Sequence, residues 1–273
     1  MELASELRGG GRHQVLQSVP MPRFERYIGI RYSGRKEPTA SLAEIRVFAA
    51  REDREVYQEF NTGAKNGEWS RRALAEWLAA DLAEAAPTIV ALDHAFSFPR
   101  TYLDRHGLSS WDDFLRDFGA HWPTHESPVG DLLSGNLRRG TSEERRLTGK
   151  WDSSRTGGVF RFETKDGHAA AAHAGLPWLD YVRRAVPELH VWPFDGFAVP
   201  AGRSVIAETH PDRLLLRYPS PSPLSREEHE AYAICSWLQD RDRNDLLVRS
   251  FDPPLTEAER AQAQLEGWIL GVS

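Results

Sequence analysis

The uninterrupted sequence Thr88-Ile89-Val90-Ala91-Leu92 is followed at once by an acid, Asp93. An apolar run without polar alternation is typical of a parallel strand that is covered by helices on both faces. In open sheets of this kind, functional groups gather at the carboxyl ends of the strands. We therefore expect an α/β fold with a candidate site centred on Asp93.

The segments before this strand predict a meander and a helix. Residues 70–86 carry apolar side chains at spacings of three and four, and Pro87 ends this helix. Residues 27–30 are typical of a buried strand, and the alternating patterns of 45–49 and 55–60 predict two antiparallel strands. Three strands, a helix and a fourth strand thus come in sequence.

The segments after residue 175 alternate between strands and helices. Apolar patterns predict strands over 190–194 and 204–207 and helices over 178–186, 211–217, 226–239 and 256–265. Together with the first half, this order predicts a mixed sheet with helices on both faces. The strand over 204–207 ends at Glu208, a second acid at a strand end.

The chain of 273 residues is read as one domain over 23–273, preceded by a flexible leader over 1–22 that contains three consecutive glycines. Residues 100–175 are rich in glycine and histidine and predict a helical and irregular insertion. Within it, short helices are expected over 111–118 and 142–150.

Composition limits the class of protein. A formal net charge of −6 argues against a globally basic nucleic-acid binder but leaves a local basic groove open. The lone Cys235 excludes an internal disulfide and suits a reducing compartment. No apolar run reaches the ~18 residues of a membrane span, so we expect a cytoplasmic protein.

Five short segments carry a resemblance to a known family. They are YIGIRYSG (27–34), IVALDHAFSFP (89–99), AETHP (207–211), EHEAYA (228–233) and EGWILGV (266–272). In this order the segments resemble the family of predicted RNase H-like nucleases, catalogued as a domain of unknown function. The resemblance implies an RNase H-like sheet and hydrolysis of phosphodiesters in a nucleic acid.

The implied chemistry uses two divalent cations, Mg²⁺ or Mn²⁺, which activate water and stabilise the leaving oxygen. Such cations need several converging carboxylate oxygens. By the resemblance, Asp93 and Glu208 are metal ligands, and the helix over 226–239 supplies a further carboxylate from Glu230 or Glu228.

Two positions depart from the family pattern. Arg31 stands where the family carries an aspartate, and Tyr232 aligns with another. A guanidinium repels a metal ion, so Arg31 is expected either in an ion pair with Asp93 or Glu208 or in contact with a phosphate. Ser33, just beyond the same strand, is a second candidate phosphate contact.

The densest basic stretch lies in the insertion. It consists of Arg138, Arg139, Arg145 and Arg146. This stretch is either a contact for the backbone of a nucleic acid or a solvated helix face.

Two functions remain open. The first is a divalent-metal-dependent nuclease or nucleic-acid-processing protein. The alternative is a catalytically degenerate RNase H-like binding module for nucleic acid, a nucleotide or a protein partner. His94 and His210 directly follow the two matched acids, as general bases or as plain polar residues at the sheet edge.

Overall fold

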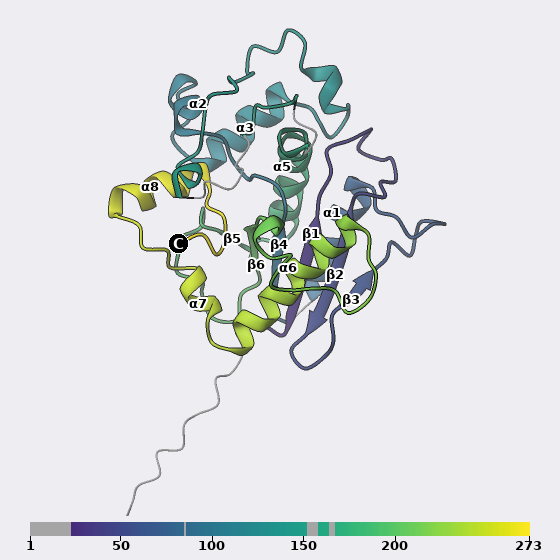
Figure 1. Ribbon diagram of the computed structural model, residues 1–273. Coiled ribbons are helices and arrows are strands. Elements are labelled where there is room, and N and C mark those ends of the chain that lie inside the picture. The colour runs from purple at the N-terminus through teal and green to yellow at the C-terminus, as the bar shows by residue number, and fades with distance from the viewer. Residues whose placement is uncertain (1–22, 85, 152–157, 164–166) are drawn as a thin grey trace, which may run out of the picture.

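The computed structural model describes residues 23–84, 86–151, 158–163 and 167–273. The expected leader over 1–22 lies outside these residues. Six strands form one sheet in the order β3-β2-β1-β4-β6-β5 (Figure 1). Their bounds are β1 Arg26–Arg31, β2 Arg46–Arg51, β3 Tyr57–Glu59, β4 Thr88–Leu92, β5 His190–Trp192 and β6 Val205–Glu208. The predicted α/β class and mixed sheet are confirmed.

The sheet divides into an antiparallel and a parallel half. β1 pairs antiparallel with β2, and β2 pairs antiparallel with β3. β1, β4, β6 and β5 run parallel to one another, so their carboxyl ends meet at one edge. Arg31, Asp93 and Glu208 all lie at this edge because each ends or directly follows one of these strands.

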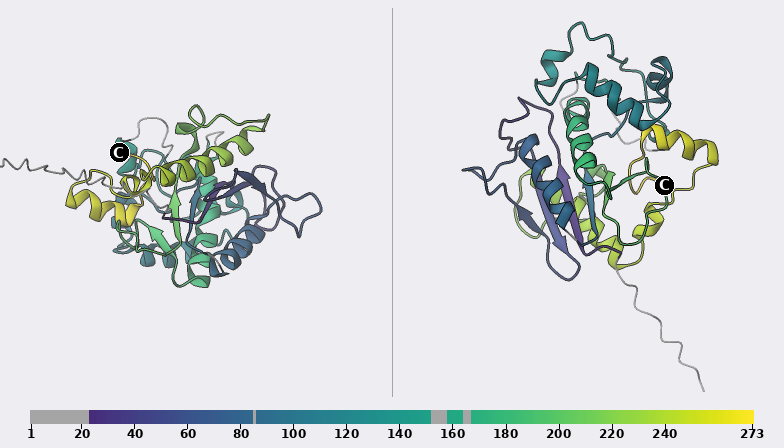
Figure 2. Two further views of the ribbon diagram at one scale, coloured as in Figure 1. Left: turned by 90° about the horizontal axis from the view of Figure 1, so that it is seen from below. Right: turned by 180° about the vertical axis from the view of Figure 1, so that it is seen from behind.

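Helices cover both faces of the sheet. Figure 1 shows α6 (Arg226–Arg243) across the front, and the rear view in Figure 2 shows α1 (Arg71–Glu84) and α5 (His168–Ala185) on the other side. Strand β4 is buried along its whole length because its side chains pack into the hydrophobic cores on both faces of the sheet. Val90 and Leu92 pack towards α1 and α5, whereas Ile89 and Ala91 pack towards α6.

β1 approaches α6 more closely than a side chain would permit. A Cβ atom at Gly29 would lie 2.5 Å from both the Ala231 carbonyl oxygen and the Cys235 nitrogen. Only glycine allows two backbones this close, so Gly29 fixes the distance between strand and helix. The next residue on the same face of β1 is Arg31, which is thereby brought against α6.

The insertion folds into short helices above the strand ends (Figure 1). They are α2 Arg100–Arg105, α3 Trp111–His121, the 3₁₀ turn η1 Val129–Leu132 and α4 Thr148–Trp151. The helix predicted over 142–150 is wrong for most of its length. Glu144 pairs with Arg105 at 2.8 Å and accepts the Thr141 N–H, while Arg146 turns inward, so tertiary contacts prevail over helical periodicity.

Helix α5 begins at His168, ten residues earlier than the predicted start at 178, and its first turns contain the alanine run 169–172. Pro177 lies inside this helix, where it lacks the N–H that would bond the carbonyl of His173. The Thr124 hydroxyl donates to that carbonyl at 2.6 Å. The insertion thus supplies the hydrogen bond that proline removes, and the helix continues through it.

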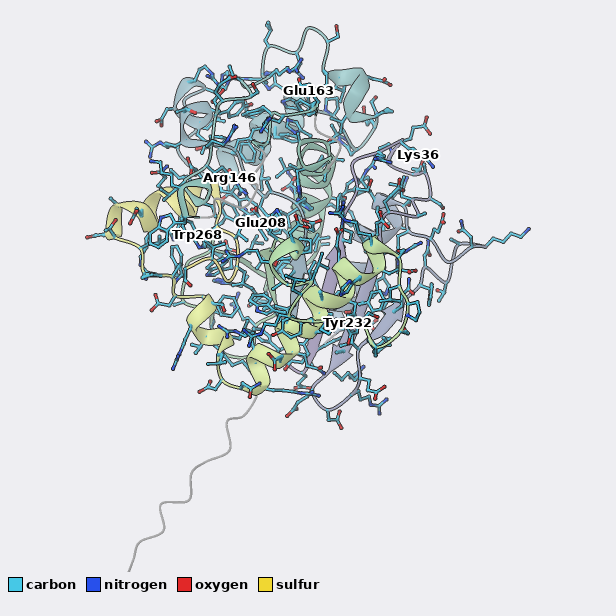
Figure 3. The ribbon with its side chains drawn as sticks, viewed as in Figure 1. Lys36, Arg146, Glu163, Glu208, Tyr232 and Trp268 are labelled. Carbon is cyan, nitrogen blue, oxygen red and sulfur yellow. The ribbon has the colours of Figure 1, made fainter. Side chains whose placement is uncertain are left out.

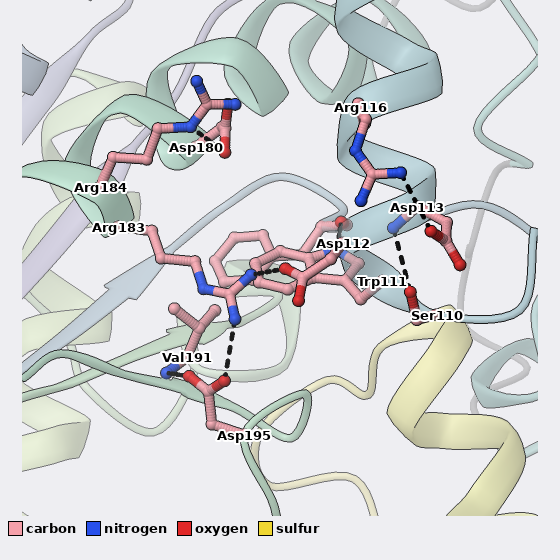
Figure 4. Close-up of polar contacts among 11 residues, drawn as sticks. Ser110, Trp111, Asp112, Asp113, Arg116, Asp180, Arg183, Arg184, Val191 and Asp195 are labelled. Atoms are coloured by element: carbon pink, nitrogen blue, oxygen red, sulfur yellow. Dashed lines mark hydrogen bonds and ion pairs between the residues drawn. The ribbon is translucent and has the colours of Figure 1, made fainter. Parts of the chain in front are cut away.

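A guanidinium ties the insertion to the sheet. Figure 4 shows Arg183 of α5 between Asp112 of α3 and Asp195, which follows β5, with 3.2 Å to the latter. The guanidinium also lies 4.7 Å from the centroid of the Trp111 ring. Because Arg183 of α5 binds both α3 and the segment after β5, it holds the insertion in position above the strand ends.

The C-terminal part closes the sheet on the β5 side. After the 3₁₀ turn η2 (Pro211–Arg213) and α6 come α7 (Leu247–Ser250) and α8 (Glu257–Glu266). Of the helix predicted over 211–217, only η2 is regular. None of the helices in the described ranges is long and apolar enough to cross a bilayer.

Candidate functional site

Two adjoining cavities lie at the carboxyl ends of the parallel strands. The larger, about 440 Å³, is called here the Arg31 cavity, and the smaller, about 40 Å³, the Arg146 cavity. Asp93, His168 and His210 line both. The candidate site predicted from the sequence therefore coincides with the principal hollow at this edge of the sheet.

In the Arg31 cavity, one guanidinium joins two carboxylates. Arg31 lies 3.2 Å from Asp93 and 2.5 Å from Glu230, measured between nitrogen and oxygen atoms. Arg226, one helical turn before Glu230, binds the other oxygen of that carboxylate at 2.8 Å. Burial would make unpaired carboxylates costly here, and Arg31 supplies a counter-charge next to both acids.

In the Arg146 cavity, the Glu208 carboxylate forms a bidentate ion pair with Arg146. Nη1 lies 2.6 Å from one carboxylate oxygen, and Nη2 binds the other. The Phe96 N–H adds a third hydrogen bond at 3.2 Å, and Arg146 Nη1 also donates to the Glu266 carbonyl at 3.1 Å. Figure 3 labels Arg146 and Glu208 together where the insertion meets the sheet.

The sheet register explains why Glu208 and Asp93 have separate partners. Glu208 pairs with Leu92 across the parallel ladder, so its side chain shares the face of Leu92. Asp93 comes one residue later and points to the opposite face, towards α6. The two acids predicted as joint metal ligands are neighbours at the edge but turn to different sides.

The Asp93 carboxyl lies in an unusual electrostatic environment. Burial is the main cause that raises its pKa, the Arg31 charge lowers it, and Glu230, Asp212 and Glu208 raise it, so that the pKa lies at about 8. Desolvation therefore outweighs the ion pair. Near neutral pH a substantial fraction of Asp93 is protonated.

The arrangement does not fit a divalent cation. In the ranges that the structure describes, no three acidic, histidine or cysteine side chains are placed to hold a metal ion. Arg31 stands between Asp93 and Glu230, and Arg146 takes up both oxygens of Glu208. A metal ion at any of these carboxylates would have to displace a guanidinium that already binds it.

Other predicted residues have structural roles. Glu228 accepts the Ser225 N–H in a capping box and lies 3.5 Å from Arg46, away from Asp93. Tyr232 packs its ring edge against Phe48, with ring centroids 5.9 Å apart, and Figure 3 shows it farther along α6 than the strand ends. Glu230, two residues earlier, is the α6 acid that reaches the site.

The basic stretch of the insertion is largely occupied by ion pairs. Arg138 binds Asp117 at 2.7 Å, and Arg139 lies 3.4 Å from Glu163. Arg145 donates to backbone carbonyls of the loop that carries it and lines the Arg146 cavity. Arg146 is buried against Glu208. Three of the four arginines thus already face an acid, which leaves less free positive charge for a nucleic-acid backbone.

The two histidines behave differently. His94 is enclosed by aromatic rings, with Tyr32 4.7 Å away between centroids, and burial lowers its pKa to about 4. It therefore stays neutral and packs as an aromatic residue. His210 is 8% exposed and lines both cavities, and its Nδ1 atom has no hydrogen-bond partner among the described residues.

The sequence reasoning missed three residues of the site: Arg226, Asp212 and Glu266. Arg226 precedes Glu230 by four residues, a helical spacing that the sequence does show. Glu266 is 1% exposed and accepts the Leu147 N–H at 2.5 Å. No local signal marks this contact because the partners are far apart in the chain.

Comparison with known protein families, with curated proteins and with solved structures finds no match. The site is therefore interpreted from its own geometry and from the resemblance of its sequence segments.

Proposed function

We propose that this chain is an RNase H-like protein that binds a nucleotide, free or at the end of a nucleic-acid strand, without hydrolysing it. One observation carries the proposal. The carboxylates implied as metal ligands are held by guanidinium groups, Asp93 and Glu230 by Arg31, and Glu208 by Arg146. This is the degenerate alternative, and the two departures from the family pattern, Arg31 and Tyr232, support it as well.

The topology supports the RNase H-like part of the proposal. An antiparallel meander β3-β2-β1 continues into the parallel strand β4, and Asp93 follows β4 directly. α6 then packs on β1 and presents Glu230 at the strand end. These features agree with the order of the segments that carry the resemblance.

The Arg31 cavity supports a ligand of nucleotide size. Its volume of about 440 Å³ falls within the ~300–1,000 Å³ that small-molecule sites occupy. Its lining combines arginine and acidic residues with Ser33 and Gly34. A base or sugar could exchange hydrogen bonds with such a wall.

The test separates binding from cleavage. The full chain is incubated with labelled single-stranded and duplex DNA and RNA of mixed sequence, with Mg²⁺, with Mn²⁺ or with a chelator. We expect no cleavage product in any arm. Direct titration with nucleotides and with the same strands in the chelator arm is expected to show saturable binding, because no metal ion takes part in it.

Metal-dependent cleavage that Asp93→Asn abolishes would contradict the proposal and favour the nuclease. Asp104→Asn, at an exposed carboxylate on α2, is the matched control for that substitution. Absence of binding to every nucleotide and strand would contradict the binding function itself.

A further inference from the structure

The Arg31 cavity contains more acids than arginines. Its three arginines stand at positions 31, 35 and 226. Its five acids are Glu44, Asp93, Asp212, Glu227 and Glu230. An excess of acids repels a phosphate and favours a group that donates hydrogen bonds. A nucleotide would therefore enter this cavity with its neutral part rather than with its phosphate.

Arg31 retains one nitrogen that can contact a ligand. Its Nε atom binds Glu230 at 2.5 Å, and its Nη1 atom binds the Tyr32 carbonyl and lies 3.2 Å from Asp93. The side chain is 17% exposed, and in the described ranges Nη2 is neither hydrogen-bonded nor buried. Because the guanidinium charge already faces two carboxylates, Nη2 suits a neutral acceptor such as a carbonyl oxygen.

Glu227 supplies an acceptor on the α6 wall of the cavity. It lies in the first turn of α6, is partly exposed, and is close enough to Arg31 for its charge to act on that guanidinium. The other four acids of the cavity each face an arginine within 4 Å, whereas Glu227 has no such partner in the part of the chain that the structure describes. A carboxylate has two oxygens, so it pairs well with two neighbouring N–H groups of a ligand.

Two imidazole rings form a further wall. His168 and His210 both line the cavity, and their ring centroids lie 5.2 Å apart. Planar side chains of this kind pack on the faces of nucleobases. These rings therefore suit the flat base of a nucleotide better than its sugar.

Arg71 of α1 holds the loop after β1 in place. Its buried guanidinium donates to the carbonyls of Ser33 at 3.3 Å, Arg35 at 2.6 Å and Lys36 at 2.9 Å. Ser33 and Arg35 also line the Arg31 cavity. This wall is therefore preformed, and a preformed site loses less conformational freedom when a ligand binds.

We infer that the Arg31 cavity recognises an unpaired guanine base, with Arg31 Nη2 donating to its O6 carbonyl and Glu227 accepting from N1–H and N2–H₂. Guanine presents a carbonyl oxygen beside two such donors on one edge. The inference rests on the proposed function and makes it more specific, because it names the part of the nucleotide that is recognised. A free guanosine nucleotide and a strand with an unpaired guanine both carry this group.

Calorimetric titration of the full chain compares three pairs of ligands that differ only by the 2-amino group. They are guanosine and inosine, GMP and IMP, and a short single strand that carries one guanine or has hypoxanthine in its place. We expect the guanine member of at least one pair to bind about tenfold more tightly. A preference in the GMP pair identifies a free nucleotide as the source, and a preference in the strand pair alone identifies a nucleic acid.

The variant Glu227→Gln replaces one acceptor oxygen by an NH₂ group, and Glu76→Gln, at an exposed acid of α1, is the matched control. We expect Glu227→Gln to lose the preference for guanine while it still binds the hypoxanthine ligand, and the control to keep the preference. Equal affinity within all three pairs, or an unchanged preference in Glu227→Gln, would overturn the inference and leave the proposed function standing. Failure of all six ligands to bind would overturn both.

Discussion

The guanidinium of Arg31 lies 3.2 Å from the carboxylate of Asp93 and extends to Glu230 on α6. Three side chains from β1, the β4 end and α6 therefore meet at one point. The backbone contact at Gly29 sets this geometry, because it brings β1 within reach of α6. In a metal-dependent enzyme, a cation would be needed at this point to balance the carboxylates. In this chain the guanidinium of Arg31 supplies the positive charge next to Asp93 and Glu230 instead.

Arg31→Asp should convert the site into one that responds to metal. Without a cation, three carboxylates would be buried together, so the variant should be less stable than the unmodified chain. Saturating Mn²⁺ should restore about 2–3 kcal/mol of stability at a concentration of ~100 times the Kd. Thermal unfolding with and without Mn²⁺ measures this response.

The unmodified chain should show no comparable shift. Arg184→Asp, at an exposed arginine on α5 that Figure 4 shows paired with Asp180, makes the same charge change elsewhere. A Mn²⁺ response of equal size in the unmodified chain would contradict the role of Arg31 as the counter-charge of these carboxylates.

Asp93 should make folding less favourable as the pH rises. Burial raises its pKa to about 8, whereas in an unfolded chain an aspartate titrates near ~3.9. The native state thus binds the proton more tightly, so this contribution to stability is complete below pH ~4 and is lost as the pH rises through about 8. The total change is on the order of several kcal/mol.

Asp93→Asn removes this titration, so urea unfolding between about pH 5 and pH 9 should show a smaller loss of stability than in the unmodified chain. Asp104→Asn, whose carboxylate is exposed, should leave the pH dependence unchanged. If Asp93→Asn and the unmodified chain lose stability in parallel, Asp93 does not titrate in this window.

The fold was more predictable than the site. The apolar run of β4 and the alternation of β2 are local patterns, and they predicted both strands and the position of Asp93. The partner of Glu208 was not predictable in this way, because Arg146 lies 62 residues earlier in a segment whose periodicity suggested a helix. The predicted start of α5 at 178 was also wrong, and the distant Thr124 hydroxyl, which binds the carbonyl that Pro177 leaves free, explains how the helix passes through this proline.

Arg146→Met should be strongly destabilising, because it leaves the buried Glu208 carboxylate without its counter-charge. Loss of one partner of a buried ion pair costs about 3–5 kcal/mol. Combining it with Glu208→Gln should recover much of that loss, since the carboxylate charge is then absent. Urea unfolding of the single and double variants measures the coupling.

Arg72→Met removes an exposed arginine that pairs with Glu76 on α1, and it should change stability by no more than about 0.5 kcal/mol. Additive effects of the Arg146 and Glu208 substitutions would contradict a direct contact between these side chains.

Glu266→Gln should loosen the attachment of the insertion without unfolding the sheet. The Glu266 carboxylate accepts backbone N–H groups from Arg100, at the start of α2, and from Leu147, so it joins two parts of the insertion to the end of α8. A glutamine offers an NH₂ group in place of one acceptor, which leaves a buried N–H unpaired at a cost of about 1–3 kcal/mol. Limited proteolysis should then cut within the insertion sooner, whereas Glu257→Gln, at an exposed acid of the same helix, should not change the cleavage rate. If Glu266→Gln resists proteolysis as well as the unmodified chain, the insertion is held chiefly by Arg183 and its aromatic contact with Trp111 rather than by this carboxylate.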